Sequence, residues 1–228
     1  DIHLKDYAWL GVRPDKIVYV SDHLDEMYRA AEKLIAAGHA YVCECVQDIV
    51  KEKRAKGEPC AHRSRQTKEN QAVWESMLSE PQQGMTLRLK GDLNDHNTAF
   101  RDPTLFRTIV EEHPRTQHKF HLWPTYDFEN AAMDGIMGVT HRLRSKEFEL
   151  RNKVQQHIQK LLGFTPTKIY EFARFNLEGV ESSGRIIREK IESGELLGWD
   201  DPSLTTLQAL KRRGFNPTAI KNFVLSTG

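Results

Sequence analysis

Three cysteines and a histidine near the start of the chain have the spacing of a metal site. Cys43-x-Cys45 and Cys60-x-His62 form two close pairs with 14 residues between them. Thiolate sulfur and imidazole nitrogen are ligands that zinc binds tetrahedrally. The spacing therefore predicts a structural zinc site, because four protein ligands leave no coordination position open for chemistry. The alternative is a pair of buried free thiols beside a surface histidine.

Basic side chains are concentrated in the same part of the chain. Residues 51–68 hold seven of them against two glutamates: Lys51, Lys53, Arg54, Lys56, Arg63, Arg65 and Lys68 against Glu52 and Glu58. A run of this kind is commonly a solvated helix face, and the alternative is contact with a polyanion backbone. The composition alone leaves both interpretations open.

A second group of polar residues lies within the stretch WPTYDFENAAMDGIMGVTHRLRSKEF. Tyr126 stands just before an expected helix, and Asn130 lies within it. Residues 139–144 then alternate as in a strand, which places Arg142 and Arg144 on one face. The pattern predicts a cluster of polar and charged groups inside an apolar frame.

An arginine at the carboxyl end of a strand in an α/β sheet lies where such sheets bind ligands. Its planar guanidinium matches a carboxylate through two parallel hydrogen bonds. The alternative is that Arg142 and Arg144 are surface residues that pair with Glu147 or Glu149.

The stretch VESSGRIIRE, residues 180–189, is a third candidate. Ser183, Gly184 and Arg185 stand just before a helix-like run. Backbone N–H groups at a helix start can bind phosphate, which would make this a phosphate loop. A serine in the same place is also an ordinary helix N-cap.

The predicted elements supply the frame for these residues. Residues 1–42 have the pattern helix, strand, helix, strand, which predicts part of a parallel α/β sheet. The first strand is expected at residues 15–20, and Ser21 or Asp22 is expected to cap the helix after it. Further on, the sequence predicts helices at 47–56 and 67–79, antiparallel strands at 85–90, 105–110 and 118–123, a long amphipathic helix around 148–162, a strand at 168–172 and two short helices within 203–226.

The composition excludes several classes of protein. The 228 residues are 39% hydrophobic and 29% charged, which is typical of globular chains, and the net charge of +1 confines any anion site to a local patch. No run of 18 apolar residues exists, so no membrane span is expected. Three cysteines without a visible signal peptide indicate a reducing compartment, and we expect a cytoplasmic protein. Because the first residue is Asp1, we expect a piece of a longer protein.

Four motifs in register resemble one enzyme family. They are FRDPTLFR…EHPRTQHKF, PTYDF…D…GVTHRLRSKEF, YEFARFNLE and GWDDPSLTTLQALKRRGF. Together they are similar to the class I glutamyl-tRNA synthetases of the archaeal type, a branch shared with the glutaminyl enzymes. The resemblance implies ATP-dependent ligation of L-glutamate to the 3′ end of tRNA through a glutamyl-adenylate. It also places the HIGH motif before Asp1 and the anticodon-binding domain after Gly228, so that this fragment would be inactive alone.

The fold implied by the resemblance is α/β. It is a partial Rossmann-type nucleotide-binding catalytic domain, split by an α+β acceptor-stem-binding insertion and followed by a short helical extension. The implied segments are the end of the first catalytic half (1–42), the insertion with its zinc element (43–120), the second catalytic half (121–185) and the start of the helical stem-contact region (186–228).

The resemblance also assigns the substrate pocket. Tyr126 matches the tyrosine that hydrogen-bonds the amino acid, and Asn130 matches a polar residue of the same pocket. Arg144 matches the arginine that holds the side-chain carboxylate of glutamate. The glutaminyl branch has a small neutral residue there, and a charged residue left unpaired in a pocket costs several kcal/mol. Arg144 thus favours glutamate over glutamine, and a glutaminyl-tRNA synthetase is the alternative it speaks against.

The ATP site follows from the same matches. Ser145 corresponds to a residue near the ribose, and Arg174 and Phe175 to the stretch that meets adenine. Ser183 and Arg185 correspond to the phosphate-contacting loop. For Arg174, an ion pair with a neighbouring glutamate is the alternative.

Two positions depart from the family pattern. Ser183-Gly184-Arg185 falls on the SKR form of the KMSKS signature, so that Gly184 stands where the signature has its catalytic lysine. Arg185 or the backbone amides would have to replace it. Ser203 replaces the arginine of a GWDDPR element. Both departures raise the alternative of a non-catalytic tRNA-binding paralogue with a degenerate ATP loop.

The implied cofactors and partners complete the expectation. ATP with Mg would be required, and structural zinc would be held by Cys43, Cys45, Cys60 and His62, with His62 a ligand swap for the fourth family cysteine. The partners would be the tRNA acceptor stem and L-glutamate, without a membrane, and the protein would be a monomer. A stand-alone zinc-dependent nucleic-acid module is a further alternative, which the α/β part of the chain disfavours.

Overall fold

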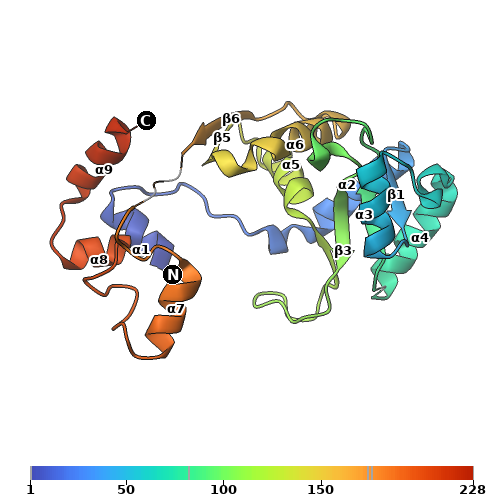
Figure 1. Cartoon of the computed structure of the whole chain (residues 1–228). Helices are drawn as coiled ribbons and strands as arrows, with labels where there is room; N and C mark the ends of the chain where they lie inside the picture. The colour runs from blue at the N-terminus through green and yellow to red at the C-terminus, as the bar shows by residue number, and fades with distance from the viewer. Residues whose placement is uncertain (1, 82, 174, 176, 228) are drawn as a thin grey trace. The chain divides into compact units, whose positions relative to one another are not determined.

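The structure, a computed structural model, has mixed α/β content and describes residues 2–81, 83–173, 175 and 177–227 (Figure 1). The chain divides into two compact units. One comprises Val18–Glu171, and the other comprises Asp1–Ile17 with Phe172–Gly228. These are called the sheet unit and the helical unit below. The four catalytic and insertion segments expected from the resemblance stay a prediction.

An antiparallel four-stranded sheet forms the centre of the sheet unit. Its strands, in spatial order, are β1 (Ala40–Cys43), β2 (Thr86–Leu89), β3 (Thr104–Thr108) and β4 (Leu122–Pro124). Val42 lies opposite Leu87, and Leu87 lies opposite Phe106, so that apolar residues align across three strands. The antiparallel strands expected at 85–90 and 105–110 are confirmed, and the one expected at 118–123 is shorter and lies at Leu122–Pro124. The parallel sheet expected from residues 1–42 is wrong, because β1 pairs antiparallel with β2, and a strand pattern does not specify its partner.

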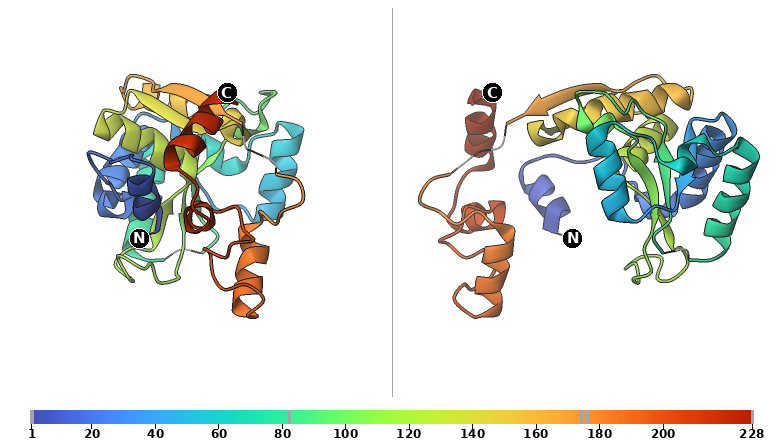
Figure 2. Two further views of the ribbon diagram at one scale, coloured as in Figure 1. Left: turned by 90° about the vertical axis from the view of Figure 1, so that its left-hand side faces the viewer. Right: turned by 45° about the vertical axis from the view of Figure 1, so that its right-hand side comes forward.

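Helices bury one continuous core against this sheet. They are α2 (Leu24–Ala36), α4 (Thr67–Ser79), α5 (Tyr126–Met137) and α6 (Glu149–Leu161), and α5 and α6 lie side by side in both views of Figure 2. Three buried aromatic rings meet in the middle of this core. The Phe106 ring centroid lies 5.3 Å from that of Trp74 and 4.8 Å from that of Phe128. The helices expected at 47–56 and 67–79 are confirmed as α3 (Gln47–Lys56) and α4.

A separate two-stranded sheet carries the arginine pair. It consists of β5 (His141–Ser145) and β6 (Lys168–Phe172), and α6 connects them in sequence. The expected alternation along β5 is confirmed, because Leu143 is 71% exposed whereas Arg144 is 6% exposed. The strand therefore directs its arginines toward α5 and α6, which lie on its buried side.

The helical unit contains α1 (Ile2–Trp9), α7 (Gly184–Glu192), α8 (Leu207–Arg212) and α9 (Pro217–Ser226). Its small core joins Ile187 of α7 with Leu204 and Ala209. The two expected C-terminal helices are confirmed. Asn216 caps α9 by accepting a hydrogen bond from the Thr218 amide at 2.8 Å, and Pro217 suits the first helical position.

Two expectations near the N-terminus are wrong. Residues 15–20 form no strand; instead a 3-10 turn, η1 (Val20–Asp22), ends the segment. In the described ranges no strand pairs with this stretch, and an unpaired β-branched run has nothing to hold it extended. The N-cap of α2 is His23, not Ser21 or Asp22, and it makes no side-chain cap hydrogen bond. Among the described residues, no helix is long and apolar enough to span a lipid bilayer.

Candidate metal cluster and substrate pocket

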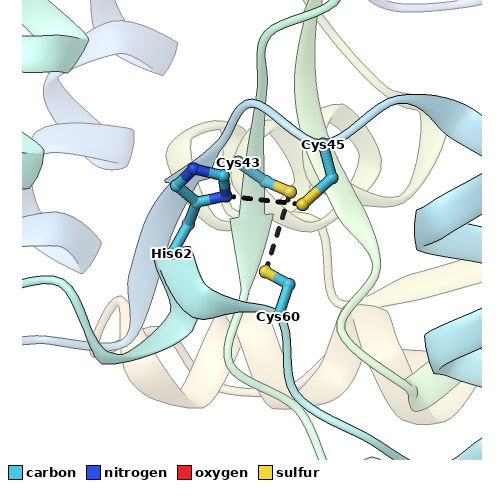
Figure 3. A group of neighbouring side chains, drawn as sticks. All are labelled: Cys43, Cys45, Cys60 and His62. Carbon is cyan, nitrogen blue, oxygen red and sulfur yellow. Dashed lines mark hydrogen bonds between the residues drawn. The ribbon is translucent and has the colours of Figure 1, made fainter.

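The two Cys/His pairs converge on one point. Cys43 ends β1, Cys45 follows it, and Cys60 and His62 flank the start of a 3-10 turn, η2 (Ala61–Ser64). The four ligand atoms lie within 4.8 Å of one another, with Cys43 Sγ 3.8 Å from Cys60 Sγ and Cys45 Sγ 3.5 Å from His62 Nδ1 (Figure 3). Tetrahedral zinc separates two sulfurs by about 3.8 Å and a sulfur from a nitrogen by about 3.6 Å. The residues present therefore fit this ion.

The closeness of the sulfur atoms shifts the pKa values of the thiols in this cluster. Burial and the neighbouring sulfurs of Cys43 and Cys60 raise the pKa of Cys45 to about 12. Burial also acts to raise the pKa of Cys60, but hydrogen bonds from Tyr41, Cys43 and the backbone lower it overall. All three thiols are free of disulfides. A bound cation would favour the thiolate form at each of them.

A buried aspartate, Asp102, is connected to the cluster through Tyr41, and its spacing in the sequence does not indicate this role. Asp102 is 1% exposed, and its Oδ2 accepts hydrogen bonds from Tyr41 at 2.9 Å and from Arg63 Nε at 2.8 Å. Its backbone carbonyl accepts hydrogen bonds from Nε and Nη2 of the buried Arg88 guanidinium, at 3.0 and 2.7 Å. The Gly91 amide donates to Oδ1 at 2.8 Å. The signal that could have revealed it is its place in the FRDPTLFR motif.

Gly91 allows the backbone to come close to Phe100 and Asp102. A Cβ atom on Gly91 would lie 2.0 Å from the carbonyl oxygen of Phe100, closer than any side chain tolerates. Asp102 itself has a φ of +45°, which is uncommon for a residue other than glycine. The buried hydrogen bonds of its carboxylate can offset that strain.

Part of the basic run is used within the fold. Arg54 donates to the carbonyls of Arg101 and Thr98 at 2.8 and 2.9 Å, and Arg63 binds Asp102. Arg65 pairs with Glu44. Burial lowers the pKa of Arg54, as expected for a guanidinium partly removed from water. Three of the seven basic groups thus stabilise the loops around the metal cluster, which weakens the case for a polyanion-binding surface built from the whole run.

Arg144 is the centre of the second group of polar residues. Its guanidinium donates from Nη1 to Gln155 Oε1 at 2.6 Å and to Asn152 Oδ1 at 3.1 Å, and from Nη2 to the Tyr126 hydroxyl at 3.4 Å. Its Nε is buried without a hydrogen-bond partner. Burial lowers its pKa, although a guanidinium remains charged. In the described part of the chain, none of the groups that contact Arg144 is a carboxylate.

Two aromatic rings flank this guanidinium. The Arg144 Cζ atom lies 4.9 Å from the ring centroid of Phe148 and 5.6 Å from that of Tyr126. Both rings also line a cavity of about 690 Å³ beside Arg144, together with Arg54, Asp127 and eight other residues of the same unit. Its size suits a small molecule. The arrangement is a cationic donor set held between aromatic walls.

Arg142, two residues earlier on β5, is neutralised instead. Its Nε donates to Asp134 Oδ2 at 2.8 Å, and its Nη2 donates to the same carboxylate oxygen. Its Nη2 also donates to the Asn130 carbonyl at 3.1 Å. It also donates to Gln155 Oε1. Arg142 therefore ties β5 to α5, whereas Arg144 is hydrogen-bonded to neutral groups, and Asp127 and Glu171 act on its charge without a direct contact.

The other pocket residues lie on the same elements. Tyr126 begins α5 and is 43% exposed, and Asn130 lies one turn later with its Nδ2 bonded to the Tyr126 carbonyl at 2.9 Å. Ser145 ends β5 immediately after Arg144. The structure thus brings Tyr126, Asn130, Arg144 and Ser145 together at the carboxyl end of β5 and the start of α5.

Gln155 and Asp127 belong to this group and were missed from the sequence. Both are buried polar residues, and Gln155 lies on α6 between the apolar positions Val154 and Ile158. A polar residue at a buried helical position is the signal that could have identified it. Asp127 accepts from Gln155 Nε2 at 3.1 Å and from Arg151 at 2.6 Å.

The expected phosphate loop lies in the helical unit. Ser183 is the N-cap of α7, but its hydroxyl makes no capping hydrogen bond, and Gly184 is the first helical residue. A Cβ atom on Gly184 would meet no atom within 4 Å, and Gly184 has no positive φ. The Arg185 side chain is 80% exposed and lies 3.8 Å from Glu189. The stretch is therefore a helix start with an accessible guanidinium, at which the Ser183 amide donates to Glu181 Oε1 at 2.7 Å.

The remaining ATP-site residues are placed in part. Phe175 is half-exposed, with its ring centroid 6.0 Å from that of Phe223. Arg174 lies outside the described residues. Ser145 belongs to the sheet unit, whereas Phe175, Ser183, Gly184 and Arg185 belong to the helical unit.

Comparison with known sequences gives one consistent result. Residues 1–228 match the family described as "tRNA synthetases class I (E and Q), catalytic domain". The chain is 45% identical over 224 residues to a Glutamate–tRNA ligase of Korarchaeum cryptofilum, covering 96% of the chain and 39% of that relative. It is 41% identical over 228 residues to a Glutamate–tRNA ligase of Pyrococcus horikoshii, covering 99% of the chain and 40% of that relative. The chain thus spans about two fifths of the length of these curated relatives.

Solved structures show the same fold. The crystal structure of a glutamate tRNA ligase from Elizabethkingia meningosepticum, in complex with its amino acid, aligns with a TM-score of 0.57 at 15% identity. The alignment covers 97% of this chain and 49% of that one. At this identity the likeness concerns the fold alone.

Proposed function

The chain belongs to the class I tRNA synthetases for glutamate and glutamine, as a part of their catalytic domain, and from this premise we propose that the protein containing it is a glutamate–tRNA ligase. It would join L-glutamate to the 3′ end of tRNA in two steps. In the first, the α-carboxylate attacks the α-phosphorus of ATP and expels pyrophosphate. In the second, a ribose hydroxyl of the terminal adenosine takes the acyl group and AMP leaves.

The observation that carries this proposal is the state of Arg144. It is buried and charged, its contacts are neutral, and its Nε has no hydrogen-bond partner. A buried charge without a counterion is costly, and a ligand carboxylate would supply the missing partner. The side-chain carboxylate of glutamate meets that need with two hydrogen bonds, whereas the amide of glutamine would leave the charge uncompensated. Tyr126 and Asn130 would complete the pocket.

For ATP, the proposal follows the family motifs residue by residue. Ser145 would lie near the ribose, Arg174 and Phe175 near adenine, and Ser183 with Arg185 near the phosphates. Phosphoryl transfer depends on positioning and on stabilising negative charge rather than on covalent catalysis. Magnesium, when bound with ATP, would supply part of that charge stabilisation. An exposed guanidinium at a helix start supports a phosphate-contacting role for Arg185.

Zinc and the tRNA acceptor stem belong to the proposal as well. Cys43, Cys45, Cys60 and His62 would hold a structural zinc ion, a role that their spacing and donor types support. The surrounding segment, about residues 43–120, would be the insertion that contacts the acceptor stem, and about residues 186–228 would begin the helical stem-contact region. Lys51 and Lys68 are candidates for phosphate contacts.

A second candidate function has one observation in its favour. Gly184 has no side chain to reach a phosphate, which is consistent with a tRNA-binding paralogue without ligase activity. That alternative predicts tRNA binding with a steep salt dependence and no adenylate formation.

Glutamate-dependent ATP–pyrophosphate exchange by the full-length protein, in the presence of tRNA, tests the proposal. We expect exchange with glutamate. An absence of exchange, combined with retained tRNA binding, would contradict the ligase and favour the paralogue.

A further inference from the structure

Gln155 is a buried amide on α6 that connects both arginines of β5 to a buried aspartate. It is 0% exposed. Its Oε1 accepts hydrogen bonds from Arg144 Nη1, at 2.6 Å, and from Arg142 Nη1, while its Nε2 donates to Asp127 Oδ1 at 3.1 Å. This environment admits one orientation of the amide, because the oxygen must face the two cations and the amino group must face the carboxylate. The side chain is therefore fixed at both ends.

The two arginines that share this oxygen differ in their remaining contacts. Arg142 binds the carboxylate of Asp134, so its charge is compensated. Arg144 contacts the neutral groups of Gln155, Asn152 and Tyr126, and its Nε is a buried donor with no hydrogen-bond partner. Gln155 thus holds Arg144 in place without using its positive charge.

We propose that Gln155 is a positioning residue that fixes Arg144 through a neutral contact and so leaves its charge available to the carboxylate of the amino-acid substrate. The proposal rests on the proposed function. A glutamate at position 155 would also hold Arg144, but it would neutralise the guanidinium and compete with the substrate. An apolar side chain would leave the charge intact and release the guanidinium from its fixed position. An amide fixes the group without competing for it.

The same helix offers a matched control. Gln159 lies one turn after Gln155, is also 0% exposed, and exchanges hydrogen bonds with Thr167 at 2.8 and 3.0 Å. In the described part of the chain its side chain bonds to Thr167 and to neither arginine. A substitution there disturbs an equally buried glutamine while leaving the arginine contacts unchanged.

The experiment compares the wild-type full-length protein with Gln155→Glu, Gln155→Met and Gln159→Glu by ATP–pyrophosphate exchange in the presence of tRNA. We expect Gln155→Glu to raise the KM for glutamate about 100-fold and to leave the KM for ATP within about twofold. Gln155→Met is expected to raise the glutamate KM about tenfold, since it frees the guanidinium but keeps its charge. In Gln159→Glu, both constants should stay within about twofold of the wild type.

Four outcomes would count against these claims. A wild-type glutamate KM in Gln155→Glu, or an equal rise in Gln159→Glu, would overturn the positioning role while leaving the ligase intact. If Gln155→Glu does not fold, Gln155→Met carries the test, and a wild-type KM in that variant would overturn the role. An inactive wild-type protein would overturn the proposed function itself.

Discussion

The sheet unit and the helical unit handle charge in opposite ways. In the sheet unit, Arg88, Arg144 and Asp102 are nearly inaccessible to water, and each is bonded to groups from other elements. In the helical unit, Arg185 is 80% exposed, and its recorded partner is Glu189 of its own helix. Buried charges are fixed in position and interact strongly with nearby groups. The interactions of exposed charges are weakened by water and salt, and their side chains are free to move.

The difference suits the two units to different tasks: recognition of a substrate carboxylate in the sheet unit, and neutralisation of phosphate charge in the helical unit. A pocket that must distinguish a carboxylate from an amide needs a cation that water cannot solvate. Arg144, which is buried, meets that condition. A loop that contacts phosphates while negative charge develops needs an accessible side chain on a segment that can move. The predictions therefore run from large effects in the sheet unit to small ones in the helical unit.

The largest effect is expected from Arg144→Gln. This change removes the cation from a buried site, and kcat/KM for glutamate should fall about 1000-fold in full-length protein. Arg115→Gln is the control, because Arg115 and its ion-pair partner Asp22 are both half-exposed. We expect less than about a fivefold change there. Similar losses in the two variants, measured by pyrophosphate exchange, would mean that burial does not distinguish these arginines.

Loss of the metal cluster should act on stability. Cys43→Ser removes a buried ligand, and we expect it to lower the free energy of unfolding by about 4 kcal/mol and to reduce bound zinc to near zero. Denaturant unfolding and metal analysis measure both quantities. A chelator should destabilise the wild type and leave the variant unchanged. Equal effects of the chelator on both proteins would argue against a metal at this cluster.

In the helical unit, Gly184→Lys should raise activity. A side chain at this position meets open space, and the backbone conformation suits any residue. An added ammonium at the helix start is expected to raise kcat about tenfold, while Gly184→Ala, which adds only the Cβ, should leave it within about twofold. No gain in Gly184→Lys would indicate that Arg185 or the backbone already performs this role, or that the loop is inactive.

The smallest effect is expected at Asp201. Its carboxylate accepts hydrogen bonds from the Leu197 amide and from the amide and hydroxyl of Ser203, which lower its pKa from 3.8 to about 2. A lowered pKa stabilises the folded state above pH 4 or so, and this contribution disappears as the pH falls through about 2. The melting temperature of Asp201→Asn should therefore lie slightly below the wild type at pH 6 and match it at pH 2. A constant difference across this range would contradict the shift.

Most helices could be predicted from the sequence, through a periodic apolar face or through local end signals. Residues 24–36 and 149–161 have such a face. Residues 47–56 and 217–226 bury no side chain and are marked by their ends, at Gly57 and at Asn216-Pro217. Strand pairing could not be predicted in the same way. The partner of β1 is β2, far along the chain. The β-branched run at 15–20 packs Val18 and Val20 against the core, but among the described residues no strand pairs with it.

In the candidate site, too, local sequence signals identified some residues, whereas residues that depend on long-range contacts were missed. Cys43, Cys45, Cys60 and His62 could be grouped from spacing, and Arg144 could be placed on a buried face from the alternation of β5. Gln155, Asp127 and Asp102 could not, because their significance lies in contacts across distant elements. Sequence indicates which residues can do chemistry, whereas the groups that hold them become visible only in three dimensions.

The most direct test of the central claim is the ratio of kcat/KM for glutamate to that for glutamine in the wild-type full-length protein. A buried Arg144 without a counterion predicts a preference for glutamate of about 1000-fold or more. A ratio near one, or a preference for glutamine, would contradict the assignment of Arg144 as the group that selects the substrate.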